Sequence, residues 1–175
     1  MHEVMEGHEE HGGPGTLPVA VTMSILAVLV AMATLMGHRA GTEEILLQAQ
    51  ASDQWAFYQA KNIRAHEMQS VADILGSLAP ADKEKAESLR EKYVKQGERY
   101  EKEKDEISDK AKELESERER LAKREDRFDA AEVILEIALI ICSLTLLTTK
   151  KFFWYSGMFI GVVGLVVGLS GFLVR

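Results

Sequence analysis

The segment AESLREKYVKQGERYEKEKDEISDKAKELESERERLAKREDRF, residues 86–128, carries apolar side chains at an unbroken seven-residue interval. These positions are Ala86, Tyr93, Tyr100, Ile107, Leu114, Leu121 and Phe128. A companion row on the same side is half polar: Leu89, Gln96, Lys104, Ala111, Arg118 and Glu125. A narrow apolar stripe on a strongly charged helix is typical of one strand of a coiled coil. The segment therefore predicts a long helix that pairs with another helix along one seam.

The partner helix is expected just upstream, within the charged region 38–129, which we call the arm. Its turn signal is LAPAD at 78–82, where Pro80 stops one helix and Asp82 can cap the next. At about 1.5 Å per residue the two helices would be roughly 55 and 70 Å long. The difference predicts a bend or an irregular joint in the first helix, most simply at Gly41. We therefore expect an antiparallel helical hairpin.

Apolar blocks flank the arm on both sides, at residues 17–37, 130–149 and 152–174. Each has about the 20 residues that a helix needs to cross roughly 30 Å of hydrocarbon. Lys150-Lys151 forms the turn between the last two blocks, and the aromatic run at 152–155 suits the headgroup level. The predicted fold class is an all-α membrane protein with three transmembrane helices and the hairpin, a coiled-coil arm, between the first and second.

Two rows of small residues run along the apolar blocks with spacings that alternate between four and three. The first block carries Ala20, Ser24, Ala27, Ala31, Thr34, His38 and Gly41. The third block carries Gly157, Gly161, Gly164, Gly168 and Gly171. Small residues let helix backbones approach closely, and this period favours a left-handed crossing. The glycine row predicts a packing seam whose partner is the first row, in the same chain or a neighbouring one, and a homo-oligomer held partly through it.

Polar residues near one end of these blocks form a candidate intramembrane site: Glu136, Glu132, His38 and Arg39. An ionisable residue at membrane depth is costly, which makes Glu136 a functional candidate. It would carry a proton or coordinate a cation. The alternative is a structural carboxyl, protonated or bonded to Thr34, His38 or Arg39.

Amides and aromatics alternate with alanines around the helix at 48–62, QAQASDQWAFYQAKN. No face of this stretch is simply polar or simply apolar, which is typical of a helix with polar partners on several sides. Trp55, Tyr58 and Gln59 form a candidate interaction surface. The alternative, which we favour, is packing inside the arm or between subunits.

Residues 1–16 predict a flexible acidic tail that contains His2, His8 and His11. A divalent metal on His8 and His11 is the alternative, but the tail offers no scaffold for it. The tail also lacks the basic start of a signal peptide.

Because acidic and basic residues nearly balance in the arm, we expect no nucleic-acid partner. The single cysteine, Cys142, lies in an apolar block and is expected to be a buried hydrophobe.

The arm's first half resembles an uncharacterised bacterial family, the domain of unknown function numbered 4337. The residues that carry the likeness are His38-Arg39, Thr42-Glu43-Glu44, Gln48, 51–61 (ASDQWAFYQAK) and Arg64. The resemblance covers about residues 18–173 and implies a bacterial membrane protein with one spanning helix, a charged middle and two spanning helices. It brings no known activity, so no site is carried over.

These features lead to a structural or scaffolding protein of a membrane, with the bilayer and further copies of itself as partners. The resemblance implies that the protein is bacterial, so we expect it in the inner membrane. A protein partner of the arm stays open. The alternative is an oligomeric channel or ion-conducting assembly that uses Glu136. We expect no enzyme, cofactor or metal, because no catalytic set of residues comes together in the sequence. The positive residues favour a cytoplasmic arm and an outside tail.

Overall fold

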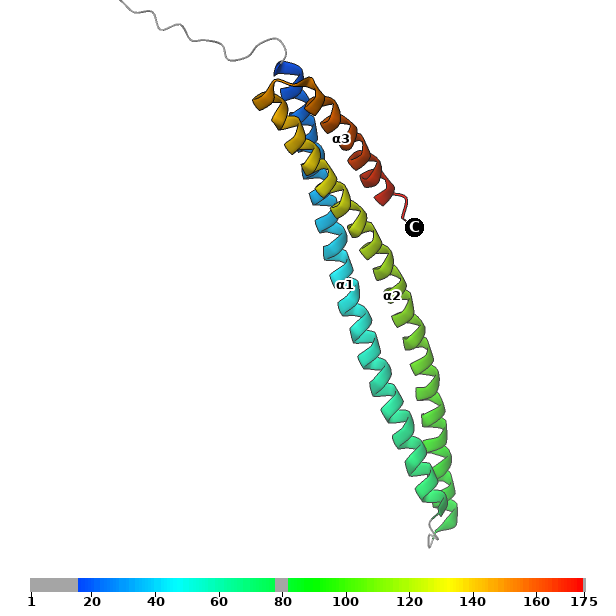
Figure 1. The fold of residues 1–175 in the computed structure, drawn as a ribbon. Helices are drawn as coiled ribbons and strands as arrows, with labels where there is room; N and C mark the ends of the chain where they lie inside the picture. The colour runs from blue at the N-terminus through cyan, green and yellow to red at the C-terminus, as the bar shows by residue number, and fades with distance from the viewer. Residues whose placement is uncertain (1–15, 78–81, 175) are drawn as a thin grey trace, which may run out of the picture. The chain divides into compact units, whose positions relative to one another are not determined.

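The computed structural model describes residues 16–77 and 82–174, and the elements in those ranges are helices. They are α1 (Thr16–Ser77), α2 (Lys83–Thr148) and α3 (Lys151–Gly171), shown in Figure 1. The predicted all-helical class is therefore confirmed. The tail and residues 78–81 of the predicted turn lie outside the described ranges.

The chain divides into two compact units, which we describe separately. The apolar unit comprises Met1–Gly41 with Ala122–Arg175, and the charged unit comprises Thr42–Leu121. α1 and α2 contribute to both units, whereas α3 belongs to the apolar unit alone.

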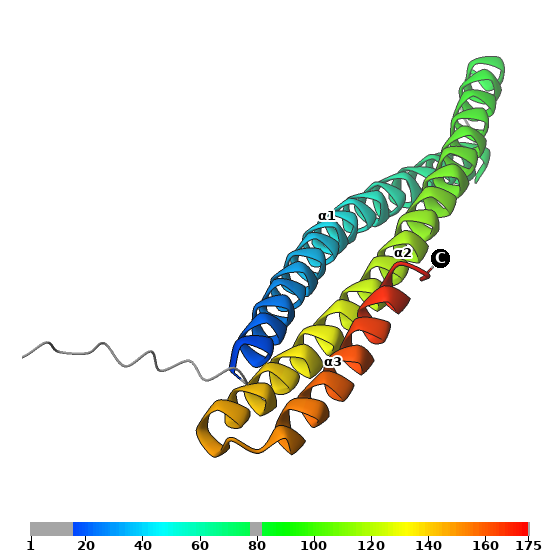
Figure 2. The same ribbon diagram turned by 90° about the horizontal axis from the view of Figure 1, so that it is seen from above.

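In the charged unit, α1 and α2 pack side by side in opposite directions (Figures 1 and 2). Residue pairs that bond across them, such as Glu44 with Arg118 and Lys61 with Glu103, show the antiparallel order. The row predicted on α2 is buried or half-buried at every position from Ala86 to Leu121. In the companion row Leu89 is the exception, at 41% exposed. The pairing of the two long helices is thus confirmed.

The side that α1 presents to α2 has its own seven-residue row, which we did not predict. Its members are Ala51, Tyr58, Ala65 and Ala72. The three alanines are buried and the tyrosine is half-buried. Small side chains at these positions let the two backbones approach, so the bulky residues of α2 fill the seam.

The predicted irregular joint at Gly41 is wrong, because α1 runs through this position as α-helix; the alternative of a bend is a separate prediction. Glycine in a helix interior costs about 1 kcal/mol relative to alanine. In the structure the glycine leaves room for the carboxylate of Glu125, the flexible end of a side chain, which a Cβ at Gly41 would displace. The predicted cap of α2 is present, as the Lys85 backbone N–H donates to Asp82 Oδ1 at 3.1 Å.

In the apolar unit the core lies where the three helices meet. Its buried members are Leu26, Ala33, Ala131, Leu135, Ala138 and Cys142. Trp154 Nε1 of α3 donates a hydrogen bond of 3.1 Å to Thr22 Oγ1 of α1, which links these two helices at the edge of the unit. The three helices contain segments that are long and apolar enough to cross a membrane.

The connection between α2 and α3 has two residues, Thr149 and Lys150, and Lys151 already belongs to α3. The prediction of a turn at Lys150-Lys151 is thus one residue late. Thr149 has a φ of 57°, in the left-handed region that a β-branched residue rarely adopts. Its backbone N–H still donates to the Thr145 carbonyl at 2.8 Å, which holds the reversal of direction in place.

Candidate functional site

The glycine row of α3 faces α2 of the same chain. A Cβ at Gly157 would lie 2.9 Å from the Ala138 carbonyl oxygen and 3.1 Å from the Cys142 nitrogen. A Cβ at Gly164 would lie 2.9 Å from Leu135 Cγ. These approaches leave no room for a side chain, so the glycines allow α3 to pack directly on α2. Within the chain the row thus packs mainly on α2, and Gly161 also lies against Leu26 of α1, which is not part of the small row of the first block. Packing of the glycine row on the small row of a neighbouring chain stays a prediction.

The small row of the first block lies mostly on the outside of the apolar unit. Ala20, Ser24, Ala27 and Ala31 are exposed. The inward row is offset by one residue and consists of Val19, Leu26, Ala33 and Ala40, all buried. The larger side chains of this inward row decide which face of α1 turns inward.

One predicted polar residue makes a bond between helices within the apolar unit. Thr34 Oγ1 of α1 donates to Glu132 Oε1 of α2 at 2.7 Å, and Glu132 is half-buried. His38 Nδ1 lies 3.1 Å from the Thr34 carbonyl oxygen, one turn back on its own helix. Glu132 therefore takes the structural role that the sequence suggested for Glu136.

Glu136 and Arg39 lie on the outside of the apolar unit. Glu136 shares an exposed face of α2 with Val133 and Ile140. Within residues 16–77 and 82–174, no hydrogen bond or ion pair joins Glu136 to Thr34, His38 or Arg39. The four predicted polar residues thus form no single cluster: Glu132 is half-buried and bonded to Thr34, whereas His38, Arg39 and Glu136 are exposed.

The predicted interaction surface divides between the inside and the outside of the charged unit. Trp55 Nε1 donates to Glu115 Oε1 of α2 at 2.8 Å, and the Trp55 and Tyr58 rings contact edge to face at 5.4 Å. Lys104 Nζ lies 5.8 Å from the centre of the Tyr58 ring. Gln59 is exposed. Trp55 and Tyr58 therefore pack inside the hairpin of this chain.

Charged side chains next to Tyr58 continue this contact along the hairpin. Lys61 bonds Glu103 across the two helices, and Arg99 Nε donates to Glu103 Oε1 at 2.7 Å. These two hydrogen bonds, Lys61 first, lower the pKa of Glu103. A carboxyl with a lowered pKa stabilises the fold at neutral pH, and the contribution is lost as pH falls through that pKa. The hairpin should loosen in acid more than its apolar seam alone would.

The face of α1 that points away from α2 is the part of this region that sequence reasoning missed. It carries exposed apolar side chains, which we call the outer face: Ile45, Leu46, Ala49, Ala56, Phe57, Ala60 and Ile63. Ile45 is 69% and Phe57 59% exposed. From Ile45 to Ile63, one charged residue of α1 is exposed, Asp53. The sequence signal for the outer face is low charge, because 45–60 contains a single charged residue. It could not reveal which face is exposed, because both faces of the helix are poor in charge over this stretch.

Replacing Trp55 by phenylalanine should lower the free energy of unfolding by about 1–2 kcal/mol, since it leaves Glu115 without its donor. Thermal unfolding followed by circular dichroism measures the change. Ile74→Ala is the control, because Ile74 is exposed and lies outside the outer face, and it should have a smaller effect. Equal losses in both variants would contradict the inward role of Trp55.

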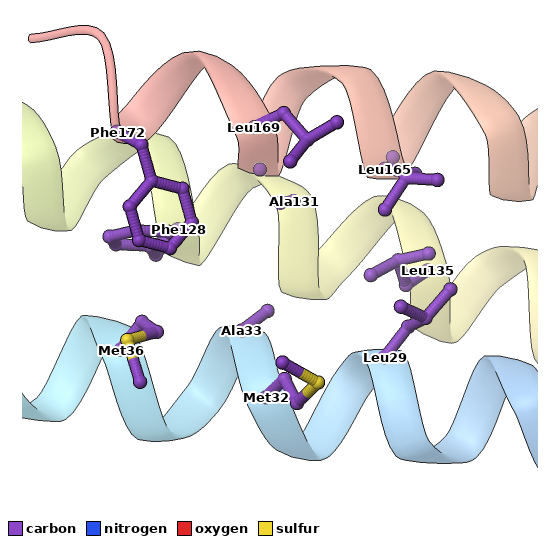
Figure 3. A pocket seen from close by; sticks show the side chains of 12 residues that line it. Leu29, Met32, Ala33, Met36, Phe128, Ala131, Leu135, Leu165, Leu169 and Phe172 are labelled. Carbon is purple, nitrogen blue, oxygen red and sulfur yellow. The ribbon is translucent and has the colours of Figure 1, made fainter.

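An apolar groove lies among α1, α2 and α3 in the apolar unit, with small residues of all three helices at its floor (Figure 3). Its volume is about 100 Å³. Within the described ranges no group of three or more His, Cys, Asp or Glu residues is placed to hold a metal ion. The chain offers a groove and helix surfaces, and no cluster of metal ligands in its described part.

Three helices with segments long and apolar enough to cross a membrane, two of which form an antiparallel charged hairpin, define a class of all-helical protein. The family model of a domain of unknown function, DUF4337, matches residues 16–174, so the chain belongs to this family. No curated protein and no solved structure matches it. The family resemblance noted in the sequence is confirmed, and the function has to be argued from the structure.

Proposed function

We propose that this protein is a membrane-anchored scaffold, in which three helices cross a bilayer and hold a coiled-coil arm in water. The observation that carries the proposal is the outside of the apolar unit. Large apolar side chains cover all three of its helices there: Leu17, Ile25, Val28, Leu35, Ile140, Leu147, Phe159, Val162, Val166 and Leu173. Exposed apolar surface of this extent marks an interaction site, and a bilayer is the partner that surrounds a helix bundle on every side.

The outer face of α1 supports self-association through the arm. Its apolar residues have no partner helix among the described residues of this chain, whereas the outward side of α2 is densely charged. Copies anchored in one bilayer present this face in the same orientation. Anchoring also raises their effective concentration, which favours a weak contact between arms. The scaffold is therefore proposed as a homo-oligomer joined by α1 of the charged unit.

The test is the subunit number of the full chain in detergent and in lipid nanodiscs, measured by native mass. Leu46→Lys with Ile63→Lys places two charges on the outer face and should release single chains. Ser88→Lys with Ser116→Lys adds the same charge to the exposed side of α2 and should leave the oligomer intact. A parent protein that is already a single chain at membrane-like concentrations would overturn the scaffold.

The exposed position of Glu136 favours a second candidate, an oligomeric channel in which this carboxylate faces a central pathway. That function requires Glu136 to point away from His38, and it is supported by the exposure of Glu136 and by the absence of a hydrogen bond or ion pair between the two among the described residues. A carboxylate against lipid alone costs about 2.5–3.5 kcal/mol at the membrane centre, so a neighbouring subunit or water is the favourable surrounding.

Glu136→Gln separates the two candidates. A channel predicts cation flux into liposomes that falls at least several-fold in the variant, while Glu67→Gln, an exposed acid of the charged unit, leaves the flux unchanged. Absence of flux from the parent and both variants would exclude the channel and retain the scaffold.

Within this proposal the protein lies in a bacterial inner membrane with the arm in the cytoplasm. The arm side of the spans carries Arg39, Lys123, Arg124 and Arg127 close to the membrane, against two lysines at 150–151 on the other side. Ser77→Cys and Ser88→Cys should resist a membrane-impermeant maleimide in intact cells and react after lysis. The parent is the blank, because its only cysteine, Cys142, is buried. Reaction without lysis would reverse the orientation.

A further inference from the structure

The apolar groove runs along the helices of the apolar unit, and we call it the slot. Its walls are Met32 and Met36 of α1 and Leu165 and Leu169 of α3, as Figure 3 shows. Small residues form its floor: Ala33, Ala131, Gly164 and Gly168. The glycines that bring α3 onto α2 also remove the side chains that would otherwise fill the slot.

Two aromatic rings close the groove at one end. Phe128 of α2 and Phe172, just after α3, contact edge to face with ring centres 5.2 Å apart. The guanidinium carbon of Arg124 lies 5.7 Å from the Phe128 ring centre and 5.5 Å from that of Phe172. A positive charge therefore lies beside the two rings at this end of an otherwise apolar slot.

The charge of Arg124 is not balanced within the described part of the chain. Its Nε is buried without a hydrogen-bond partner there, and no ion pair of Arg124 is formed in residues 16–77 and 82–174. Of the nearby acids on α2, Glu125 lies against Gly41 and Asp129 against Gly37 of α1, and Asp126 is exposed and forms no ion pair with Arg124 in the described ranges. The two rings thus hold a guanidinium that has donors left for an external anion.

We propose that this groove binds an anionic phospholipid, with one acyl chain in the slot and the phosphate on Arg124. The inference rests on the proposed insertion into a bilayer. From Leu29 to Met36 the slot spans about 10 Å, less than the roughly 15 Å of hydrocarbon in one leaflet. An acyl chain therefore extends along its whole length. The planar guanidinium offers paired donors that match phosphate geometry, and a lipid supplies anion and chain in one molecule.

The test is native mass spectrometry of the full chain in detergent, titrated with phosphatidylglycerol or phosphatidylcholine of identical acyl chains. The parent should bind phosphatidylglycerol more tightly. Arg124→Gln should weaken that binding about tenfold, towards the level of phosphatidylcholine. Lys123→Gln removes the same charge from the neighbouring exposed position and should change the affinity less than about twofold.

A second pair of variants tests the slot. Leu165→Trp fills the groove from its wall and should weaken binding of both lipids several-fold, whereas Leu173→Trp, exposed and outside the lining, should not. Circular dichroism confirms that each variant is folded, and Leu169→Trp replaces Leu165→Trp if that variant unfolds.

Three results would overturn the site. Equal losses in Arg124→Gln and Lys123→Gln would mean general charge attraction. Unchanged lipid binding after the groove is filled would exclude the slot. A change of subunit number in Leu165→Trp, measured without added lipid, would assign the groove to a second copy. Flotation with vesicles tests bilayer insertion separately, so binding through Arg124 by a protein that fails to float would retain the site and remove the anchor.

Discussion

Replacing Gly157 by alanine is expected to lower the free energy of unfolding of the apolar unit by about 2 kcal/mol. The added methyl would stand 2.9 Å from the Ala138 carbonyl oxygen, a backbone atom that cannot turn away. Overpacking of this kind costs about 1–3 kcal/mol, and the better helix propensity of alanine returns up to about 1 kcal/mol. Thermal unfolding in detergent, followed by circular dichroism, measures the difference.

Gly168→Ala is the matched control for this prediction. Its added methyl would meet the Ala131 Cβ at 3.3 Å, a contact that a slight shift relieves. Helix propensity then offsets the crowding, and the variant should stay within about 1 kcal/mol of the parent. If both glycines tolerate alanine equally, α3 does not pack on α2 through its glycine face.

Leu114→Ala should cost about 3 kcal/mol of stability in the charged unit. Leu114 is 7% exposed and lies in the buried row of α2, so its removal leaves a cavity in a seam that has few other large side chains. The measurement is loss of helical signal from the full chain with rising temperature. Leu89→Ala, at 41% exposure in the companion row, should cost less than half as much. A smaller effect at Leu114 than at Leu89 would contradict the observed pairing of the helices.

The sequence allowed the large features to be predicted because each has a clear periodicity or length. The apolar row from Ala86 to Phe128 repeats every seven residues, and the apolar blocks have the length of a span. α1 was harder, because its inward row in the charged unit is made mostly of alanines. Alanine is equally common on exposed helix faces, so composition does not distinguish the side that packs on α2 from the outer face.

The contacts in the candidate sites depend on the exact rotation of each helix about its axis. Periodicity does not determine that rotation to within one residue. Glu132 and Glu136 are one turn apart, and the position of Thr34 decides which of them is bonded between the helices. The groove was not predicted, since it arises from three helices at once. Arg124 drew attention only as a positive charge before the second block, whereas the structure places it on Phe128 and Phe172.

Each unit contains one of the chain's two tryptophans, and each indole N–H has a partner on another helix. Trp154 donates to Thr22 in the apolar unit, and Trp55 donates to Glu115 in the charged unit. Tryptophan fluorescence, excited selectively over that of tyrosine, therefore has one emitter in each unit. In Trp55→Phe the emission comes from Trp154 alone, and in Trp154→Phe from Trp55 alone. Recording both during denaturation would show whether the two units melt together or in sequence.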